Sequence, residues 1–133
     1  MNIEAFRDYC LAKPGTTDET PFGPETLVLK VGGKIFALTD IETFASLNLK
    51  CDPERAVELR ERFDYVQPGF HMNKKHWNTV QVGTGATDNQ LREWIDHSYD
   101  LVAASLPKAA RTALAAARSG TAPAGKNQAL GRL

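Results

Sequence analysis

Hydrophobic residues are spaced along the chain in patterns that change from helical to extended and back. Ile3, Phe6 and Cys10 recur at helical spacing, which predicts a short amphipathic helix over residues 3–12. Residues 16–24 are rich in Pro, Gly and short polar side chains, so a loop is expected there. The chain is therefore expected to begin with a helix and to enter its first strands only after this loop.

Two β-rich runs follow the loop and are separated by the pair Gly32-Gly33. The first run is TLVLKV (26–31) and the second is KIFALTD (34–40). Consecutive glycines accept positive φ angles at little cost, so the two runs are expected to form a tight β-hairpin. Residues 44–51 then alternate apolar and polar side chains, as a strand with one buried face does.

The middle of the chain returns to helical periodicity and then to strands. Asp52 and Pro53 are residue types that begin helices, at the N-cap and the first helical position, so a second helix is expected from Pro53 onward. Residues 65–72 and 76–82 are expected to form a second hairpin with a longer connecting loop.

The last part of the chain predicts helices and a tail. Thr87 and Gln90 have the spacing of a capping box, and the apolar residues behind them mark one helical face as far as about Leu106. Residues 107–118 are rich in alanine and predict a short final helix, whereas the composition of residues 119–133 predicts a loosely ordered tail.

Together these elements define the fold class. Strands joined by hairpins do not form a doubly wound parallel sheet, so the sequence predicts an α+β fold. We expect two layers, an antiparallel sheet of about five strands packed by helices, in the order α-β-β-β-α-β-β-α. Residues 1–118 are expected to form a single domain.

Composition narrows the class of protein. The 133 residues are 42% hydrophobic and 24% charged, which excludes a wholly disordered chain and suffices for one core without disulfides or metals. No apolar run approaches the roughly 20 residues that a membrane span needs, and the N-terminus lacks a signal-peptide pattern. We therefore expect a cytoplasmic monomer that does not act at a membrane.

A net charge of zero hides a gradient along the sequence. Residues 1–64 hold eight basic and twelve acidic side chains, residues 65–100 hold three and four, and residues 101–133 hold five and none. The potential at a surface is set by charges within about one Debye length, roughly 8 Å at physiological salt. Local clusters of cations therefore matter more for binding than the overall balance.

Residues 67–80, QPGFHMNKKHWNTV, form the densest cluster of chemically versatile side chains. Hydrogen-bond donors, cations and aromatic surface come from His71, Asn73, Lys74, Lys75, His76, Trp77 and Asn78. One interpretation is a polar hairpin tip whose Trp77 indole is anchored in the core. The other is a wing, a hairpin tip that presses cations against a phosphate backbone while an amide contacts a base edge.

Lys30 and Lys34 flank the Gly32-Gly33 turn and place a second pair of ammonium groups near a hairpin tip. Lysines at the exposed edge of a sheet also prevent edge-to-edge pairing, which is a sufficient reason for either one alone. Two hairpin tips that each carry two lysines favour a two-pronged binding surface.

Catalytic and metal-binding patterns are weak. A nucleophile pair of Cys51 with His71 or His76 is conceivable, but Cys51 occupies an apolar position of a strand and is expected to be an inert core thiol. His71, His76 and His97 lack the spacing of a metal site, and the chain holds no GxSxG, Walker or GxGxxG motif. We expect neither an enzyme nor a cofactor or metal.

Four segments carry a resemblance to a known family. They are PFGPETLVLKVGGKIFAL (21–38), KCDPERAVELR (50–60), PGFHMNKKHWNTV (68–80) and IDHSYDLVAASLPK (95–108). In this order they resemble the MmcQ/YjbR family of small bacterial proteins, over about residues 1–110.

The resemblance implies a fold like that of frataxin-type (CyaY-like) and secretion-chaperone-like domains. It also implies DNA binding through two hairpins, a double wing, which carries over here to residues 30–34 and 73–78. A frataxin-like fold further suggests iron held by an acidic first helix, but Glu4 and Asp8 offer too few carboxylates for that.

The leading hypothesis is a non-enzymatic module that binds double-stranded DNA, modestly and in a salt-sensitive way. The expected DNA-contacting residues are Lys30, Lys34, Asn73, Lys74, Lys75, His76 and Asn78. The alternative is a domain that binds a protein or a small ligand in a groove beside Trp77, His71 and His76, largely independently of salt.

Overall fold

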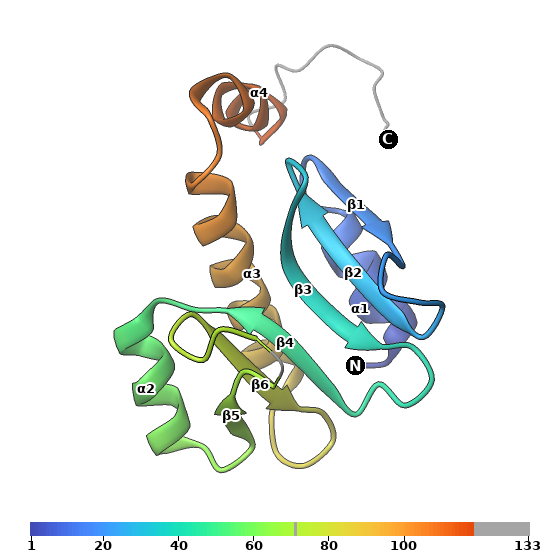
Figure 1. Cartoon of the computed structure of the whole chain (residues 1–133), viewed down its shortest axis with the longest axis vertical. Coiled ribbons are helices and arrows are strands. Elements are labelled where there is room, and N and C mark those ends of the chain that lie inside the picture. The colour runs from blue at the N-terminus through green and yellow to red at the C-terminus, as the bar shows by residue number, and fades with distance from the viewer. Residues whose placement is uncertain (71, 119–133) are drawn as a thin grey trace.

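The computed structural model describes residues 1–70 and 72–118, and its elements are those of an α+β protein (Figure 1). In chain order they are α1 (Ile3–Leu11), β1 (Thr16–Glu19), β2 (Thr26–Val31), β3 (Lys34–Asp40), β4 (Ser46–Lys50), α2 (Pro53–Arg62), β5 (Val66–Pro68), β6 (Trp77–Gln81), α3 (Asp88–Ala104) and α4 (Lys108–Arg118). The expected class, an antiparallel sheet packed by helices, is confirmed. The predicted tail, residues 119–133, lies outside the described residues.

All strands belong to one antiparallel sheet in the order β1-β2-β3-β4-β6-β5. A loop was expected over residues 16–24, and this expectation is wrong for the first part of the segment, because β1 pairs with β2 from Thr16 to Glu19. The sequence of β1, TTDE, contains no apolar residue. An edge strand of this kind has no hydrophobic period, so the pattern along the chain gave no sign of it.

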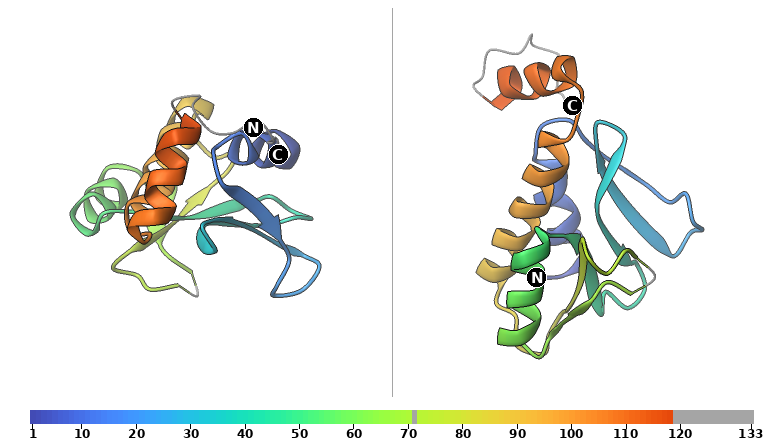
Figure 2. Two further views of the ribbon diagram at one scale, coloured as in Figure 1. Left: turned by 90° about the horizontal axis from the view of Figure 1, so that it is seen from above. Right: turned by 60° about the vertical axis from the view of Figure 1, so that its left-hand side comes forward.

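The helices cover one face of the sheet, as the left view in Figure 2 shows. α3 packs against β2, β3 and β4, α2 against β5 and β6, and α1 against β1. The largest fully buried side chains between these layers include Phe6, Leu29, Phe36, Leu47, Leu91, Ile95 and Tyr99. Each fully buried side chain of this size contributes on the order of 1.5–3 kcal/mol, so this layer holds the fold together.

Side chains at the helix N-termini bind the first backbone N–H groups, as the sequence predicts. Asp52 caps α2 by accepting a hydrogen bond from the backbone of Arg55 at 3.2 Å. Thr87 and Gln90 form the predicted capping box at the start of α3, with bonds of 3.1 and 2.9 Å in the two directions. Such caps satisfy backbone donors that have no partner within the helix, and each contributes roughly 1 kcal/mol.

The β2–β3 turn joins its strands through two glycines in the left-handed region. Gly32 has φ +58° and Gly33 has φ +81°, angles that other residues adopt at a cost. A Cβ at Gly32 would lie 2.6 Å from Cδ1 of Leu106, just beyond the end of α3, whereas a Cβ at Gly33 would meet nothing within 4 Å. The turn is therefore packed against the end of the long helix on one side only.

A β-bulge between Leu29 and Lys30 changes the alternation along the β2–β3 pair. Phe36 is fully buried and meets Tyr99 of α3 edge to face, with ring centroids 5.3 Å apart. The Ser98 hydroxyl of α3 donates to the Phe36 carbonyl at 2.5 Å and accepts from the Lys50 backbone N–H at 2.9 Å. One buried hydroxyl thus fastens two strands to the central helix.

α4 lies at the end of the molecule that carries the β2–β3 turn (Figure 1). Its Leu114 side chain would lie 2.6 Å from a Cβ added at Gly15, so the helix is packed against the chain segment before β1. Within the described ranges, no helix combines the length and the apolar character that a bilayer span requires.

Candidate nucleic-acid interface

The register of the strands places both predicted tips at the same end of the sheet. Ala37 of β3 is paired with Leu49 of β4, and Lys50 of β4 is paired with Trp77 of β6. β3 and β6 therefore both start beside the C-terminal end of β4. The β2–β3 turn and the β5–β6 loop, residues 69–76, stand on either side of this strand, and the twist of the sheet spreads them apart (Figure 1).

The two lysines of the β2–β3 hairpin have different surroundings. Lys34 is exposed at the start of β3. Lys30 forms an ion pair of 2.6 Å with Glu19 of the edge strand β1. An exposed ion pair of this kind is worth only about 0–1 kcal/mol, yet it lowers the local excess of positive charge. Lys34 therefore contributes more than Lys30 to the positive charge of this tip.

Residues 72–76 of the β5–β6 loop form a hydrogen-bonded turn with two exposed lysines. The Asn73 side-chain oxygen accepts a hydrogen bond from the Lys75 backbone N–H at 2.9 Å, and the His76 N–H donates to the Asn73 carbonyl at 3.2 Å. The Lys74 ammonium donates to the Gly69 carbonyl at 3.1 Å. Asn73, Lys74 and Lys75 are exposed and His76 is half-buried. The side-chain oxygen of Asn73 therefore shapes the turn.

Arg60 of α2 fixes the position of this loop, a role that was not expected from the sequence. Its guanidinium donates to the side-chain oxygen of Asn78 at 2.7 Å and to the backbone carbonyl of Lys74. A third contact reaches the Trp77 carbonyl at 3.5 Å. The planar guanidinium can satisfy several acceptors at once, so it fixes the loop relative to α2. No sequence motif signals this role, because it depends on how α2 packs on the sheet.

Asn78 was expected among the DNA-contacting residues, and the structure corrects this placement. The residue is only 2% exposed. Its side-chain oxygen accepts from Arg60, and its side-chain nitrogen donates to the Ala56 carbonyl at 3.3 Å. A buried amide with both ends engaged has no group left for a base edge. Asn78 is a structural link between β6 and α2.

Trp77 lies on the face of the sheet that carries no helix. It alternates with Asn78 and Val80, which point toward the helices, and it is half-buried. Among the described residues, the core and the side chains packed against it do not include Trp77. The interpretation of Trp77 as a core anchor was therefore wrong. The second aromatic in this region, Phe70, is 65% exposed in the neighbouring loop. His71, a candidate in the sequence analysis, lies outside the described residues.

The charges around the β5–β6 loop have one sign over a long stretch of sequence. Residues 65–87 contain no Asp or Glu, and their formal charges are those of Lys74 and Lys75. Residues 43–51, which include β4, also lack carboxylates and carry Lys50. Acidic side chains return on α2, where Glu54 borders a surface hollow together with Lys75. The strands themselves thus favour an anionic ligand.

The thiols are core residues. Burial raises the pKa of Cys10 to about 12 and that of Cys51 to about 11, with nearby cations lowering each by less. Thiolates are the reactive form, so at neutral pH neither cysteine is an activated nucleophile. The fold brings Cys51 beside His97 of α3, a proximity hidden in the sequence. Over residues 1–70 and 72–118, no three His, Cys, Asp or Glu side chains gather as metal ligands.

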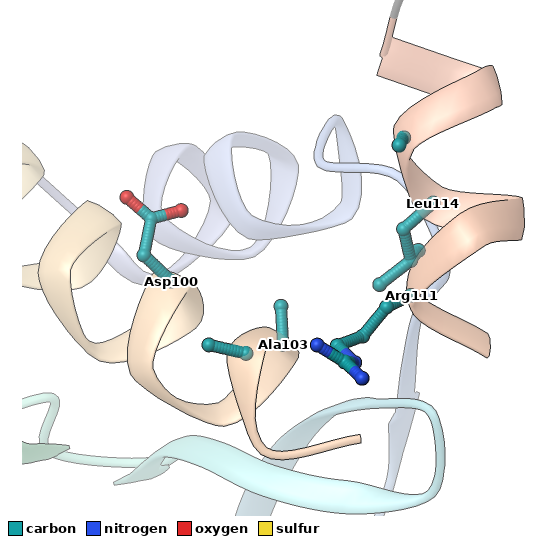
Figure 3. Close-up of a pocket in the computed structure, with 6 residues that line it drawn as sticks. Asp100, Ala103, Arg111 and Leu114 are labelled. Atoms are coloured by element: carbon teal, nitrogen blue, oxygen red, sulfur yellow. The ribbon is translucent and has the colours of Figure 1, made fainter. Parts of the chain in front are cut away.

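A hollow between α3 and α4 lies on the helical side of the molecule (Figure 3). It is lined by Asp100, Ala103, Ala104, Arg111, Leu114 and Ala115. Its floor is mostly alanine and leucine, with one cation and one carboxylate on its walls. This lining is typical of a gap between two packed helices. The cationic helix α4 lies at the same end of the molecule as the β2–β3 turn.

An α+β domain with two cationic hairpin tips at one end of its sheet is the class that this geometry defines. The family model YjbR matches residues 11–101. The chain is 33% identical to the uncharacterized protein YjbR of Escherichia coli K12 over 115 residues, which are 86% of this chain and 98% of that protein. The uncharacterized protein YbdF of Escherichia coli O157:H7 is 42% identical over 89 residues, covering 66% and 73%. The chain belongs to the YjbR family.

Solved structures agree with this assignment. The fold is similar to the crystal structure of Deinococcus radiodurans protein DR2400, with a TM-score of 0.80 and 36% identity over 96% of this chain and 93% of that one. A protein from Pseudomonas syringae has a TM-score of 0.65 and 27% identity, covering 77% and 99%. The expected membership of the MmcQ/YjbR family is thereby confirmed, together with the α+β fold class.

Proposed function

We propose that the protein is a non-enzymatic DNA-binding module whose two hairpin tips contact the phosphate backbone. Lys34 of the β2–β3 tip and Lys74 and Lys75 of the β5–β6 loop supply the ammonium groups. Asn73 and His76 shape the second tip and border the contact. The observation that carries the proposal is the position of these exposed lysines at the same end of one sheet.

The charges of the surrounding residues support an anionic partner. β4, β5 and β6 contain no carboxylate, and the acidic Glu19 of β1 is paired with Lys30, which is not among the proposed contacts. Phosphate contacts position a protein on DNA without reading sequence. With a net charge of zero on the whole chain, the affinity is expected to be modest and to fall steeply with salt.

Salt dependence gives the direct test. The affinity for a short DNA duplex is measured by fluorescence anisotropy from low to physiological salt. Three lysine contacts predict a log–log slope of about −2.7, at roughly −0.9 per phosphate neutralised. Changing Lys74 and Lys75 together to Ala should flatten the slope by about 1.8.

The matched control is Arg92→Ala, which removes an exposed cation from α3 on the helical side of the sheet. It should leave the slope unchanged. No binding at low salt, or the same loss of slope in the control, would rule the proposal out.

A further inference from the structure

The face of the sheet without helices carries more than the lysine tips. The left and right views of Figure 2 show the β1–β2 and β5–β6 loops projecting on the side of the sheet opposite to the helices. On the neighbouring strands β4 and β6, this open face is formed by Ser46, Asn48, Lys50, Trp77, Thr79 and Gln81. These residues alternate with buried ones, so they stand on the surface between the two projecting loops.

Trp77 stands on this part of the open face, and the backbone of a second aromatic residue, Phe70, is bonded to it. The Phe70 backbone N–H donates to the Thr79 hydroxyl at 2.8 Å, and the same hydroxyl donates to the Asn48 side chain at 2.5 Å. These bonds hold the start of the loop against the open face of β6. Phe70 is 65% exposed, and Trp77 is half-buried on the same strand as Thr79. Aromatic surface exposed in this way is a typical site for stacking contacts.

Cations accompany these aromatic rings. Lys50 is directly opposite Trp77 in the register, which places their Cβ atoms about 4.5–5.5 Å apart on the same face. Lys74 follows Phe70 within the same loop. No carboxylate occurs in residues 43–51 or 65–87, which contain all of β4, β5 and β6. Aromatic rings and ammonium groups therefore alternate over a region without opposing charge.

The other strongly exposed phenylalanine, Phe22, is not accompanied by an excess of cations. Phe22, in the β1–β2 loop, is 66% exposed and so presents a similar aromatic surface. Its neighbours in sequence are Asp18, Glu19 and Glu25. Asp18 is paired with Arg7 and Glu19 with Lys30, so these carboxylates cancel nearby positive charge and leave no cationic excess beside Phe22. The β1–β2 loop also lies at the other edge and the other end of the sheet. Charge thus favours the Phe70 side for a polyanion.

We infer that the β4–β6 part of the open face binds single-stranded DNA, with bases stacked on Phe70 and Trp77 and phosphates held by Lys50 and Lys74. Base stacking on aromatic side chains tolerates any sequence, because every base has a π-face. A duplex hides these faces inside its stack, so the surface selects unpaired strands. The inference rests on the proposed function, since the same loop supplies lysines to both, and it specifies the form of DNA.

The experiment compares a labelled thymidine oligonucleotide of about 12 nucleotides with a duplex of the same length, at low salt, by fluorescence anisotropy. The full chain, Phe70→Ala and Phe22→Ala are measured side by side. Both phenylalanines are exposed to the same extent, so neither change should unfold the protein, and far-UV circular dichroism checks this. The two variants differ in the charge around the lost ring.

We expect the single strand to bind more tightly than the duplex. Phe70→Ala should weaken single-strand binding roughly 5- to 100-fold, the range for loss of one stacked base, and leave duplex binding unchanged. Phe22→Ala should change neither. Quenching of tryptophan fluorescence on addition of the unlabelled oligonucleotide should accompany binding, because Trp94 is buried and Trp77 is the accessible indole.

Failure of this inference is distinguishable from failure of the proposed function. Duplex binding that is sensitive to Lys74 and Lys75, with a weaker single-strand complex or no effect of Phe70→Ala, overturns the inference and keeps the proposed function. Absence of binding to either form at low salt overturns both. A uridine oligonucleotide that binds more tightly than the thymidine one overturns the assignment to DNA.

Discussion

His97 connects α3 to the start of α2 through a neutral ring. Its Nε2 accepts a hydrogen bond of 3.2 Å from the backbone N–H of Asp52, the N-cap residue of α2. Burial lowers the pKa of His97 below its usual 6.5, and the charge of Arg55 lowers it further, against weaker opposing effects of nearby carboxylates. A ring protonated at Nε2 cannot accept this bond, so the link exists only in the neutral form.

The free energy of unfolding should depend on this ring. The unfolded chain takes up the proton near pH 6.5, whereas the folded chain resists it, so the stabilisation is complete above that pH and is lost as the pH falls through the lowered value. Urea unfolding between about pH 7.5 and about pH 5.5 measures the loss.

His97→Gln provides the control for this prediction, because an amide oxygen can accept the same bond without titrating. The stability of this variant should vary less over the same pH range. An equal loss in both proteins would assign the pH dependence to other groups.

Two residues of β6, Trp77 and Asn78, could not be placed correctly from the sequence. Asn78 was expected on the surface and is buried, whereas Trp77, for which a core position was one interpretation, is half-buried on the open face. Val80 shares the buried face with Asn78, so the alternation of β6 follows its valine and not its tryptophan. The amide is buried because Arg60 and the Ala56 carbonyl satisfy it, and these partners come from another element.

At the scale of elements, Arg60 makes α2 and the β5–β6 loop one unit. Arg60→Ala should leave the helix formed and loosen the loop, because the carbonyl of Lys74 and the side chain of Asn78 lose their donor. Hydrogen–deuterium exchange should then speed up for the amides of Lys75 and His76.

The matched control is Arg62→Ala, two residues further along α2. Its guanidinium lies over the Phe63 ring, 5.1 Å from the centroid, and not over the loop. Exchange in the β5–β6 loop should remain as in the unaltered chain. Equal exchange in both variants would mean that the loop is held by its own turn.

The β2–β3 turn offers a paired test of how a hairpin rests on a helix. Gly33→Ala meets no neighbour and should cost roughly 1–2 kcal/mol, the price of a side chain at positive φ. Gly32→Ala adds a clash with Leu106 to the same backbone cost and should destabilise more. Thermal and urea unfolding of the two variants measures the difference, and equal losses would show that Leu106 moves aside freely.

Elements whose sequence carries a strong local signal were predictable. The helix caps at Asp52 and Thr87, the glycine turn and the alternation of β4 all rest on neighbours within a few residues, and the structure confirms them. β1 was not predictable because its four polar residues are ordered by pairing with β2. The candidate site was found in part: the lysines of the tips are local features, whereas the open face depends on which side α3 covers.

At the scale of the whole molecule, the two thiols report on opening of the core. Cys10 and Cys51 are buried, and burial raises the pKa of each to about 12 and about 11. A thiol reagent at about pH 8 should therefore react with the native protein only as fast as the molecule unfolds, and rapidly once urea is added.

A control for access is Lys34→Cys, which puts a thiol on the exposed β2–β3 tip and should react at once. Rapid labelling of Cys51 in the native chain would contradict the burial described here. Cys51 would then again be a candidate nucleophile.

The two edges of the sheet determine how copies of the molecule meet. β1 is four residues long and carries the carboxylates of Asp18 and Glu19, and β5 is three residues long and ends in Pro68, which has no N–H to donate. Short, charged or proline-ended edges are poor templates for adding another strand. Concentrated solutions of the folded protein should thus resist strand-to-strand aggregation.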